Sequence, residues 1–319
     1  MGGMSPAVRA AIDIGTVSTR LLVARLLDGR IEELDRRTTI THLGRGLPES
    51  GKIQDDAVRR VLACVEEYLS VCAEHGVERL SVVATSAARD AGNGDELLAA
   101  LRVLGLEPRI ISGSEEAALS FAGAAYSVRG DGLLVIDLGG GSTELIFGRA
   151  DDEGAEVEVA RSVDVGSRRV TDMFLGTGVP AREQFEAAGS WITEQFRPFF
   201  DGLRSRPVKA IGLAGTATSL VAIESGLEPY SPDVVHGRRL SGGTIADLRE
   251  RLASMPLEER RAVPGLEPAR AEVIVAGALI LELVLGMAGL DELVVSEHDI
   301  LYGLVLEETA GREEEPNRV

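Results

Sequence analysis

Two acidic residues flank a run of three glycines near the middle of the chain. The segment Asp137-Leu-Gly-Gly-Gly-Ser-Thr-Glu144 places one carboxylate at the end of an expected strand and the other at the start of the next. Successive glycines remove the Cβ atoms where backbone must approach a ligand, and their N–H groups can bind an anion. Mg²⁺ typically takes one or two carboxylates, waters and phosphate oxygens. The segment therefore predicts a Mg²⁺ site at Asp137 and Glu144, and a phosphate-binding turn at Gly139, Gly140, Gly141, Ser142 and Thr143.

A second copy of this motif begins 124 residues earlier, at Asp13. The segments 13–23 and 137–147 share Asp, Gly, Ser, Thr and Leu at five of eleven aligned positions. That offset has the length of a domain, so we expect two related domains, each with a phosphate-binding hairpin. The alternative is a pair of ordinary glycine-rich hairpins. The candidate phosphate-binding residues of the first copy are Asp13, Gly15, Thr16, Ser18 and Arg20.

A pair of glutamates offers a candidate general base. In Ile111-Ser-Gly-Ser-Glu-Glu-Ala117 a strand is expected to end and a helix to begin. One acidic residue at this position complements the helix dipole. The other is well placed to hold a water molecule as a general base. The residues themselves leave the choice between Glu115 and Glu116 open.

Two further segments place polar groups at the ends of expected strands. Thr85-Ser-Ala-Ala-Arg-Asp90 presents Arg89, and its alternative reading is a strand end with a solvated arginine. Gly212-Leu-Ala-Gly-Thr-Ala-Thr-Ser219 is a strand–turn–helix junction whose helix N-terminus can bind a phosphate or nucleotide. The candidate ligand contacts in these segments are Arg89, Gly215 and Thr216. Arg270, at the start of an expected buried helix, is a further candidate.

Two other polar segments each have two possible roles. Gly166-Ser-Arg168-Arg169 either supplies positive charge to a ligand or forms a surface basic pair. Ser296-Glu-His-Asp299 is interpreted as a helix cap rather than a metal site.

The expected elements repeat in the two halves of the chain. In the first half we expect strands at 8–14, 19–27, 31–40, 79–86 and 107–112, and helices at 54–75, 94–104 and 114–128. The second half also opens with three strands followed by helices, with helices expected at 167–175, 181–204 and, later, 268–288, which indicates an α/β protein with mixed sheets. We expect domains at 5–129 and 130–310, with a last helix at 298–309 that could pack on the first domain, and an acidic tail at 311–319.

Composition excludes several classes of protein. The chain of 319 residues has 33 basic and 51 acidic residues, a net charge of −18, which argues against a general nucleic-acid binder. No apolar run reaches the length of a membrane span, and the first residues do not resemble a signal peptide. Cys64 and Cys72 suit core thiols of a reducing compartment. We therefore expect a cytoplasmic protein without membrane contact; a homodimer is compatible with the sequence.

Taken together, the motifs at 13–21, 85–89, 112–117, 137–144, 212–218 and 270–274 form an ordered set. With them the chain resembles the exopolyphosphatase / guanosine pentaphosphate phosphohydrolase (Ppx/GppA) family over residues 8–308. The resemblance implies an actin-like ATPase (ribonuclease H-like) fold of two related domains around a cleft. The chain departs from the family pattern at Val17, where members commonly have asparagine, and it ends where longer members add helical domains.

The resemblance also implies an activity and roles for individual residues. It places the catalytic glutamate at Glu115, the Mg²⁺ ligands at Asp137 and Glu144, and the phosphate loops at 13–20 and 139–143. The expected activity is Mg²⁺-dependent release of orthophosphate from the end of inorganic polyphosphate, by direct attack of water. Hydrolysis of pppGpp to ppGpp is the alternative within this class. A sugar kinase or a nucleotide-binding scaffold is the alternative outside it.

Overall fold

The computed structural model describes residues 7–27, 30–151 and 154–310, and the chain groups into two compact units. The first unit comprises the chain up to Ser112 and from Ile300 onward, and the second comprises Gly113–Asp299. The division thus falls earlier than the boundary expected at 129/130, because the helix at 113–125 groups with the second unit. Asp28-Gly29, a pair that predicts a hairpin turn between the strands expected at 19–27 and 31–40, and the acidic tail at 311–319 lie outside the described residues.

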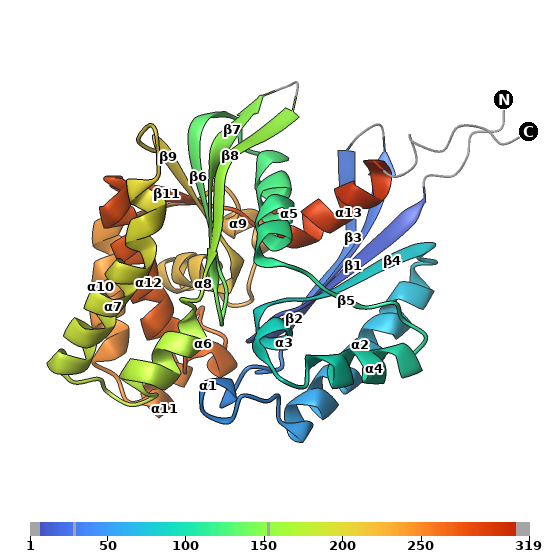
Figure 1. Ribbon diagram of the computed structural model, residues 1–319, viewed down its shortest axis with the longest axis horizontal. Helices are drawn as coiled ribbons and strands as arrows, with labels where there is room; N and C mark the ends of the chain where they lie inside the picture. The colour runs from blue at the N-terminus through green and yellow to red at the C-terminus, as the bar shows by residue number, and fades with distance from the viewer. Residues whose placement is uncertain (1–6, 28–29, 152–153, 311–319) are drawn as a thin grey trace, which may run out of the picture. The chain divides into compact units, whose positions relative to one another are not determined.

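The first unit is built on a five-stranded mixed sheet with the order β3-β2-β1-β4-β5 (Figure 1). Strand β1 pairs antiparallel with β2 and parallel with β4. Alternate residues of β1, namely Ala10, Ile12 and Ile14, share a core with helices α2 and α4, as the period of two in a strand requires. Helix α13 contacts β1 and β2 of this sheet. The strands are β1 Val8–Ile14, β2 Ser18–Leu27, β3 Arg30–Ile40, β4 Arg79–Ala84 and β5 Arg109–Ile110, and the helices are α1 Leu47–Ser50, α2 Asp55–Glu74, α3 Ser86–Asp90, α4 Gly94–Val103 and α13 Ile300–Ala310.

The second unit repeats this sheet and extends it. Its order is β10-β11-β9-β6-β7-β8, so β8-β7-β6-β9-β11 follows the same path as β3-β2-β1-β4-β5, and β10 pairs antiparallel at the edge. This repetition confirms the predicted α/β fold with two related halves. The strands are β6 Gly130–Leu138, β7 Thr143–Asp151, β8 Gly154–Val163, β9 Lys209–Leu213, β10 Arg239–Ser241 and β11 Glu292–Val295. The helices are α5 Gly113–Ala125, α6 Ser167–Val170, a π-helical turn Thr171–Leu175, α7 Arg182–Asp201, α8 Ala214–Ser225, α9 Pro232–Val235, α10 Gly242–Ala253, α11 Leu257–Arg261, a 3₁₀ turn Pro268–Arg270 and α12 Ile274–Ala288.

The two faces of the second sheet carry separate cores. On β6, Leu134 and Ile136 pack with residues of α7, α10 and α12. The alternate residues Leu133 and Val135 pack with Phe121 and its neighbours on α5. Because side chains alternate along a strand, odd-numbered residues of β6 face α5. Asp137 therefore lies on the face of the sheet that α5 covers.

Several expected elements differ from the structure at their ends. The strand expected at 79–86 stops at Ala84, and residues 86–90 form the short helix α3. The helix expected at 167–175 is split into α6 and a π-helical turn, and that expected at 268–288 begins with a 3₁₀ turn. The elements α1, α9, α11 and β10 were not predicted from the sequence. Each is five residues or shorter, which is too little for a hydrophobic period to show.

Candidate active site

Asp137 and Glu144 are directly opposite one another on β6 and β7, as the sequence predicted for the flanks of the turn. Both carboxylates are buried, with 6% and 1% of the residue exposed. Residues paired across antiparallel strands point to the same face of the sheet, with Cβ atoms about 4.5–5.5 Å apart. The hairpin therefore brings two acidic side chains together on the face that α5 covers.

Helix α5 adds a third carboxylate from Glu116. Glu116 is buried, and Ser120, one helical turn later, donates a hydrogen bond to Asp137 Oδ2. Residues four apart lie on the same face of a helix, so Glu116 and Ser120 share the face that meets the sheet. Glu115 is half-buried and lies about 100° around the helix from Glu116. The structure thus brings Glu116, rather than Glu115, to the carboxylate pair.

The neighbouring carboxylates affect the pKa of Glu144. Burial, and after it the negative charges of Glu116 and Asp137, raise the pKa of Glu144 well above its ordinary value. Hydrogen bonds from Ser162 and Ser142 lower this pKa but do not cancel the effect. A cation would relieve the repulsion among the three carboxylates.

Serine hydroxyls fix the orientation of the two opposed carboxylates. Ser162, which is paired with Glu144 in the β7–β8 register, donates to Glu144 Oε1 at 2.7 Å. Ser120 does the same for Asp137. Hydrogen bonds of this kind satisfy part of the hydrogen-bonding capacity of each buried carboxylate. Neither serine was predicted from the sequence, although the four-residue spacing of Glu116 and Ser120 could have indicated one of them.

The donor set fits a small divalent cation that keeps other ligands. Within the part of the chain that the structure describes, no group of three or more His, Cys, Asp or Glu side chains is arranged to hold a metal ion by itself. Two carboxylates completed by water and phosphate oxygens match the usual coordination of Mg²⁺ in phosphate-processing sites. Asp137 and Glu144 are the residues that would hold such an ion.

The glycine turn next to this pair has N–H groups available for an anion. Among the described residues, none accepts a hydrogen bond from the N–H of Gly140, Gly141 or Ser142. Thr143, which was also predicted to bind phosphate, instead donates its hydroxyl proton to the carbonyl of Val165 at 2.5 Å. Its hydroxyl therefore has a structural role, because a hydroxyl carries only one proton to donate.

The first copy of the hairpin has different chemistry. At the position corresponding to Glu144 it has Arg20, which pairs with Asp13 in the β1–β2 register. The Arg20 guanidinium donates to Asp13 Oδ2 through Nε at 2.9 Å and through a terminal nitrogen at 2.5 Å. An ion pair takes the place of a carboxylate pair, so this copy does not present the acidic pair that a cation needs. Beside it Thr16 Oγ1 is buried, and no described residue forms a hydrogen bond with it.

The remaining predicted contacts lie within one unit or the other. In the first unit, Arg89 donates to the carbonyl of Ile111 at 2.9 Å. In the second, a Cβ on Gly215 would lie 1.4 Å from a terminal nitrogen of Arg270. The Arg270 guanidinium therefore rests against the Gly215 backbone at the start of α8, where Thr216 is also buried. The structure brings these three residues together, and their role in binding stays a prediction.

Arg168 and Arg169 do not form the surface basic pair that was one of the two alternatives. Both form contacts within the second unit. Arg168 is buried and forms ion pairs with Glu272 at 2.9 Å and Asp172 at 3.4 Å. Arg169 donates through Nε to the carbonyl of Gly141 at 2.9 Å.

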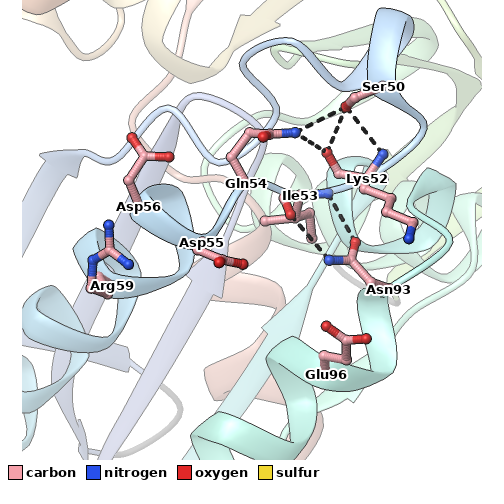
Figure 2. A pocket seen from close by; sticks show the side chains of 9 residues that line it. All are labelled: Ser50, Lys52, Ile53, Gln54, Asp55, Asp56, Arg59, Asn93 and Glu96. Carbon is pink, nitrogen blue, oxygen red and sulfur yellow. Dashed lines mark hydrogen bonds between the residues drawn. The ribbon is translucent and has the colours of Figure 1, made fainter.

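A separate pocket of about 660 Å³ opens on the first unit (Figure 2). It contains none of the predicted site residues. Asn93 joins its two sides, since its side chain both accepts from and donates to the backbone of Ile53, at 2.9 and 3.0 Å. Acidic and basic side chains line it together, which gives no preference for an anion. Its lining residues are Ser50, Lys52, Ile53, Gln54, Asp55, Asp56, Arg59, Asn93 and Glu96.

Comparison with known proteins identifies the family of the chain. A profile of the Ppx/GppA phosphatase family matches residues 22–309. Exopolyphosphatase 2 of Mycobacterium tuberculosis is 35% identical over 317 residues, covering 93% of this chain and 97% of that protein. The Aquifex aeolicus PPX-GPPA enzyme superposes with a TM-score of 0.78 at 32% identity, covering 94% of this chain and 99% of that one. An exopolyphosphatase-like protein superposes with a TM-score of 0.89 at 33% identity, covering 96% and 98%.

These relatives and the repeated mixed sheets make the chain a hydrolase with an actin-like ATPase fold. The chain belongs to the Ppx/GppA phosphatase family. Among residues 7–27, 30–151 and 154–310, none of the helices combines the length and apolar character that crossing a bilayer requires.

Proposed function

We propose that the chain is a Mg²⁺-dependent exopolyphosphatase that releases orthophosphate from the end of inorganic polyphosphate. The observation that carries this proposal is the cluster of three buried carboxylates, Glu116, Asp137 and Glu144, beside a glycine turn with N–H groups available for an anion. The similarity to Exopolyphosphatase 2 over 93% of the chain supports the choice of substrate.

Each group has a distinct task in the proposed reaction. A Mg²⁺ ion at Asp137 and Glu144 would supply positive charge that neutralises phosphoryl oxygens. The N–H groups of Gly140, Gly141 and Ser142 bind oxygens of the terminal phosphoryl group and orient it. Such reactions depend mainly on positioning and on electrostatic stabilisation of the transferring phosphoryl group.

Glu116 acts as the general base in this proposal. Its carboxylate accepts a proton from water, whose oxygen forms a bond to the terminal phosphorus as the bridging P–O bond breaks. The products are orthophosphate and a polyphosphate chain shorter by one unit. Glu115, the residue to which the family resemblance assigned this role, is the alternative base.

The first unit contributes a second anion contact in this proposal. Thr16 Oγ1 and the neighbouring turn, including Gly15 and Ser18, are proposed to bind a phosphate group. Thr16→Val keeps the shape of the side chain but removes the hydroxyl, and we expect KM for polyphosphate to rise about tenfold while kcat changes less. Thr16→Ser, which keeps the hydroxyl, is the matched control and should stay close to the wild type.

The proposal is tested by measuring orthophosphate release from polyphosphate, pppGpp and ATP side by side, in Mg²⁺ and in EDTA. We expect the highest kcat/KM for polyphosphate and no turnover in EDTA. A clear preference for pppGpp would move the assignment to the guanosine pentaphosphate branch, and equal turnover in EDTA would contradict the metal assignment.

The cytoplasmic location and the homodimer stay predictions. The two free buried cysteines, Cys64 and Cys72, support the cytoplasmic location.

A further inference from the structure

Residues 166–169, which follow strand β8, form hydrogen bonds to the carbonyl groups of the glycine turn 139–141. Ser167 N–H donates to the Gly139 carbonyl at 3.0 Å. The Gly140 carbonyl accepts from the N–H of Arg168 at 2.8 Å and of Arg169 at 3.1 Å. We call residues 166–169 the brace. They begin α6, whose first N–H groups would otherwise lack helical partners.

The side chain of Arg169 completes this set of contacts. Its Nε donates to the Gly141 carbonyl at 2.9 Å, so all three glycine carbonyls of the turn are bonded to residues of the brace. In a planar trans peptide the C=O of one residue and the N–H of the next point in opposite directions. The N–H groups of Gly140, Gly141 and Ser142 therefore point away from the brace.

Close backbone packing keeps the brace against the turn. A Cβ on Gly166 would lie 2.4 Å from the carbonyl carbon and oxygen of Gly140 and 2.5 Å from the carbonyl carbon of Gly141. Only glycine allows this approach. The buried ion pair of Arg168 with Glu272 holds the other side of the brace to the residues before α12.

The turn of the first unit is also held by backbone hydrogen bonds to its carbonyl groups. There the Thr16 carbonyl accepts from Gly44 N–H at 2.9 Å, and the Val17 carbonyl accepts from the N–H of Thr41 at 3.0 Å and His42 at 2.8 Å. A Cβ on Gly44 would lie 2.3 Å from Thr16 Cγ2. In both units, therefore, the segment after the third strand donates backbone N–H groups to the turn, and the second unit adds the side-chain contact from Arg169.

We propose that Arg169 is a positioning residue: by holding the Gly141 carbonyl, it directs the Ser142 N–H, with those of Gly140 and Gly141, toward a bound phosphate group. The proposal rests on the proposed function only for the identity of that group as the end of a polyphosphate chain. Binding of orthophosphate to the turn does not depend on turnover.

The test uses orthophosphate as the probe and the full chain as the sample. Amide signals of Gly140, Gly141 and Ser142 are followed by NMR during titration of the wild type, Arg169→Met and Arg169→Lys. Arg149→Met is the matched control, since Arg149 is an exposed arginine of β7. Melting temperatures are measured for all four proteins. Gly166→Ala, which introduces the clash described above, provides a second variant that disturbs the brace without removing a charge.

The expected results separate positioning from general destabilisation. In the wild type and Arg149→Met all three amides should shift on titration. Arg169→Met and Gly166→Ala should bind orthophosphate about tenfold more weakly, with the Ser142 shift most reduced in Arg169→Met; Arg169→Lys should recover part of the affinity. In turnover assays Arg169→Met should raise KM for polyphosphate. A loss of folded protein would instead lower the apparent kcat and leave KM unchanged.

Two results would overturn the inference. One is a wild type whose turn amides do not respond to orthophosphate, and the other is a folded Arg169→Met protein with unchanged affinity and amide shifts. If the amides respond as expected but polyphosphate is not hydrolysed, the proposed function fails and the inference about Arg169 stands.

Discussion

At the scale of single residues, the site depends on acidic groups that are costly to bury. Glu144 is 1% exposed and faces the negative charges of Asp137 and Glu116. Such repulsion is expected where stability is traded for function, and the cation that we propose for this site would relieve it. Because this repulsion lowers the stability of the folded protein, the effect of removing it can be measured by unfolding experiments.

Glu144→Gln should stabilise the metal-free protein. Replacing the buried carboxylate by a neutral amide of similar shape removes the repulsion from Glu116 and Asp137. We expect the melting temperature in EDTA at neutral pH to rise by a few degrees, since each kcal/mol corresponds to about 2–4 °C in proteins somewhat smaller than this one. Exposed Glu158 provides the control, and Glu158→Gln should melt with the wild type. A lower melting temperature of Glu144→Gln in EDTA would show that Glu144 is stabilising as a carboxylate.

The stability difference between wild type and Glu144→Gln should depend on pH. Because the pKa of Glu144 is raised in the folded protein, the folded state binds this proton more tightly than the unfolded chain. The free energy of unfolding therefore falls as pH rises from the ordinary glutamate pKa toward the raised one. Chemical denaturation in EDTA should show the gap between the two proteins closing as pH is lowered through this window. A gap that widens on acidification would mean that the pKa is shifted downward.

At the scale of elements, one hairpin serves two chemical purposes. Strands β1–β2 and β6–β7 share register and turn, but the residue opposite the aspartate is Arg20 in one and Glu144 in the other. A single position thus converts an ion pair into a carboxylate pair. This difference could be read from the sequence, but its meaning required the strand register.

Arg20→Met should destabilise the first unit. It removes the cation that neutralises Asp13, whose side chain is 4% exposed. Loss of one partner of a buried pair costs about 3–5 kcal/mol, and the partial exposure of Arg20 should bring the cost to about 2–4 kcal/mol. Arg25→Met in the same strand breaks an exposed pair with Glu32 and should cost about 1 kcal/mol or less. Urea unfolding of both variants checks the prediction, and equal costs would contradict it.

Ala214→Gly should be tolerated or stabilising. Ala214 begins α8 with φ of 63°, a left-handed conformation that costs a non-glycine residue about 1–2 kcal/mol. Glycine removes that strain but adds about 0.5–1 kcal/mol of chain entropy, so the net change should be a gain of up to about 1 kcal/mol. Ala222→Gly, in the interior of the same helix, should instead lose about 1 kcal/mol or more. Thermal unfolding distinguishes the two, and a loss at Ala214 equal to that at Ala222 would refute the strain.

Most of the fold could be predicted because its long elements carry clear periods and its turn motif is duplicated. The meanders and helices such as α2 follow directly from these signals. The conformation of Ala214, the π-helical turn after α6 and the short strand β10 could not be predicted, because tertiary packing decides them. For the site, the sequence identified Asp137 and Glu144, but the face of α5 that meets the sheet decided which glutamate joins them.

At the scale of the whole molecule, the net charge of −18 opposes a polyanionic substrate. Like charges repel over roughly a Debye length, about 10 Å at 0.1 M salt, so added salt should ease the approach of polyphosphate. We expect kcat/KM for long polyphosphate to rise as KCl is increased from about 20 to about 150 mM at constant free Mg²⁺. A short substrate with lower charge should respond less. A fall in kcat/KM with salt would instead point to a local basic surface that attracts the chain.

In the proposed function, the carboxylate cluster of the second unit hydrolyses polyphosphate with Glu116 as its base. The most direct test compares single-turnover hydrolysis and polyphosphate binding in Glu116→Gln and Glu115→Gln. The amide can still hydrogen-bond to water but cannot take its proton, so Glu116→Gln should bind polyphosphate normally and lose about 10²–10⁴-fold in rate. Glu115→Gln, its neighbour on another face of α5, should retain most of the rate. Normal turnover by Glu116→Gln, with loss of turnover in Glu115→Gln, would contradict the account.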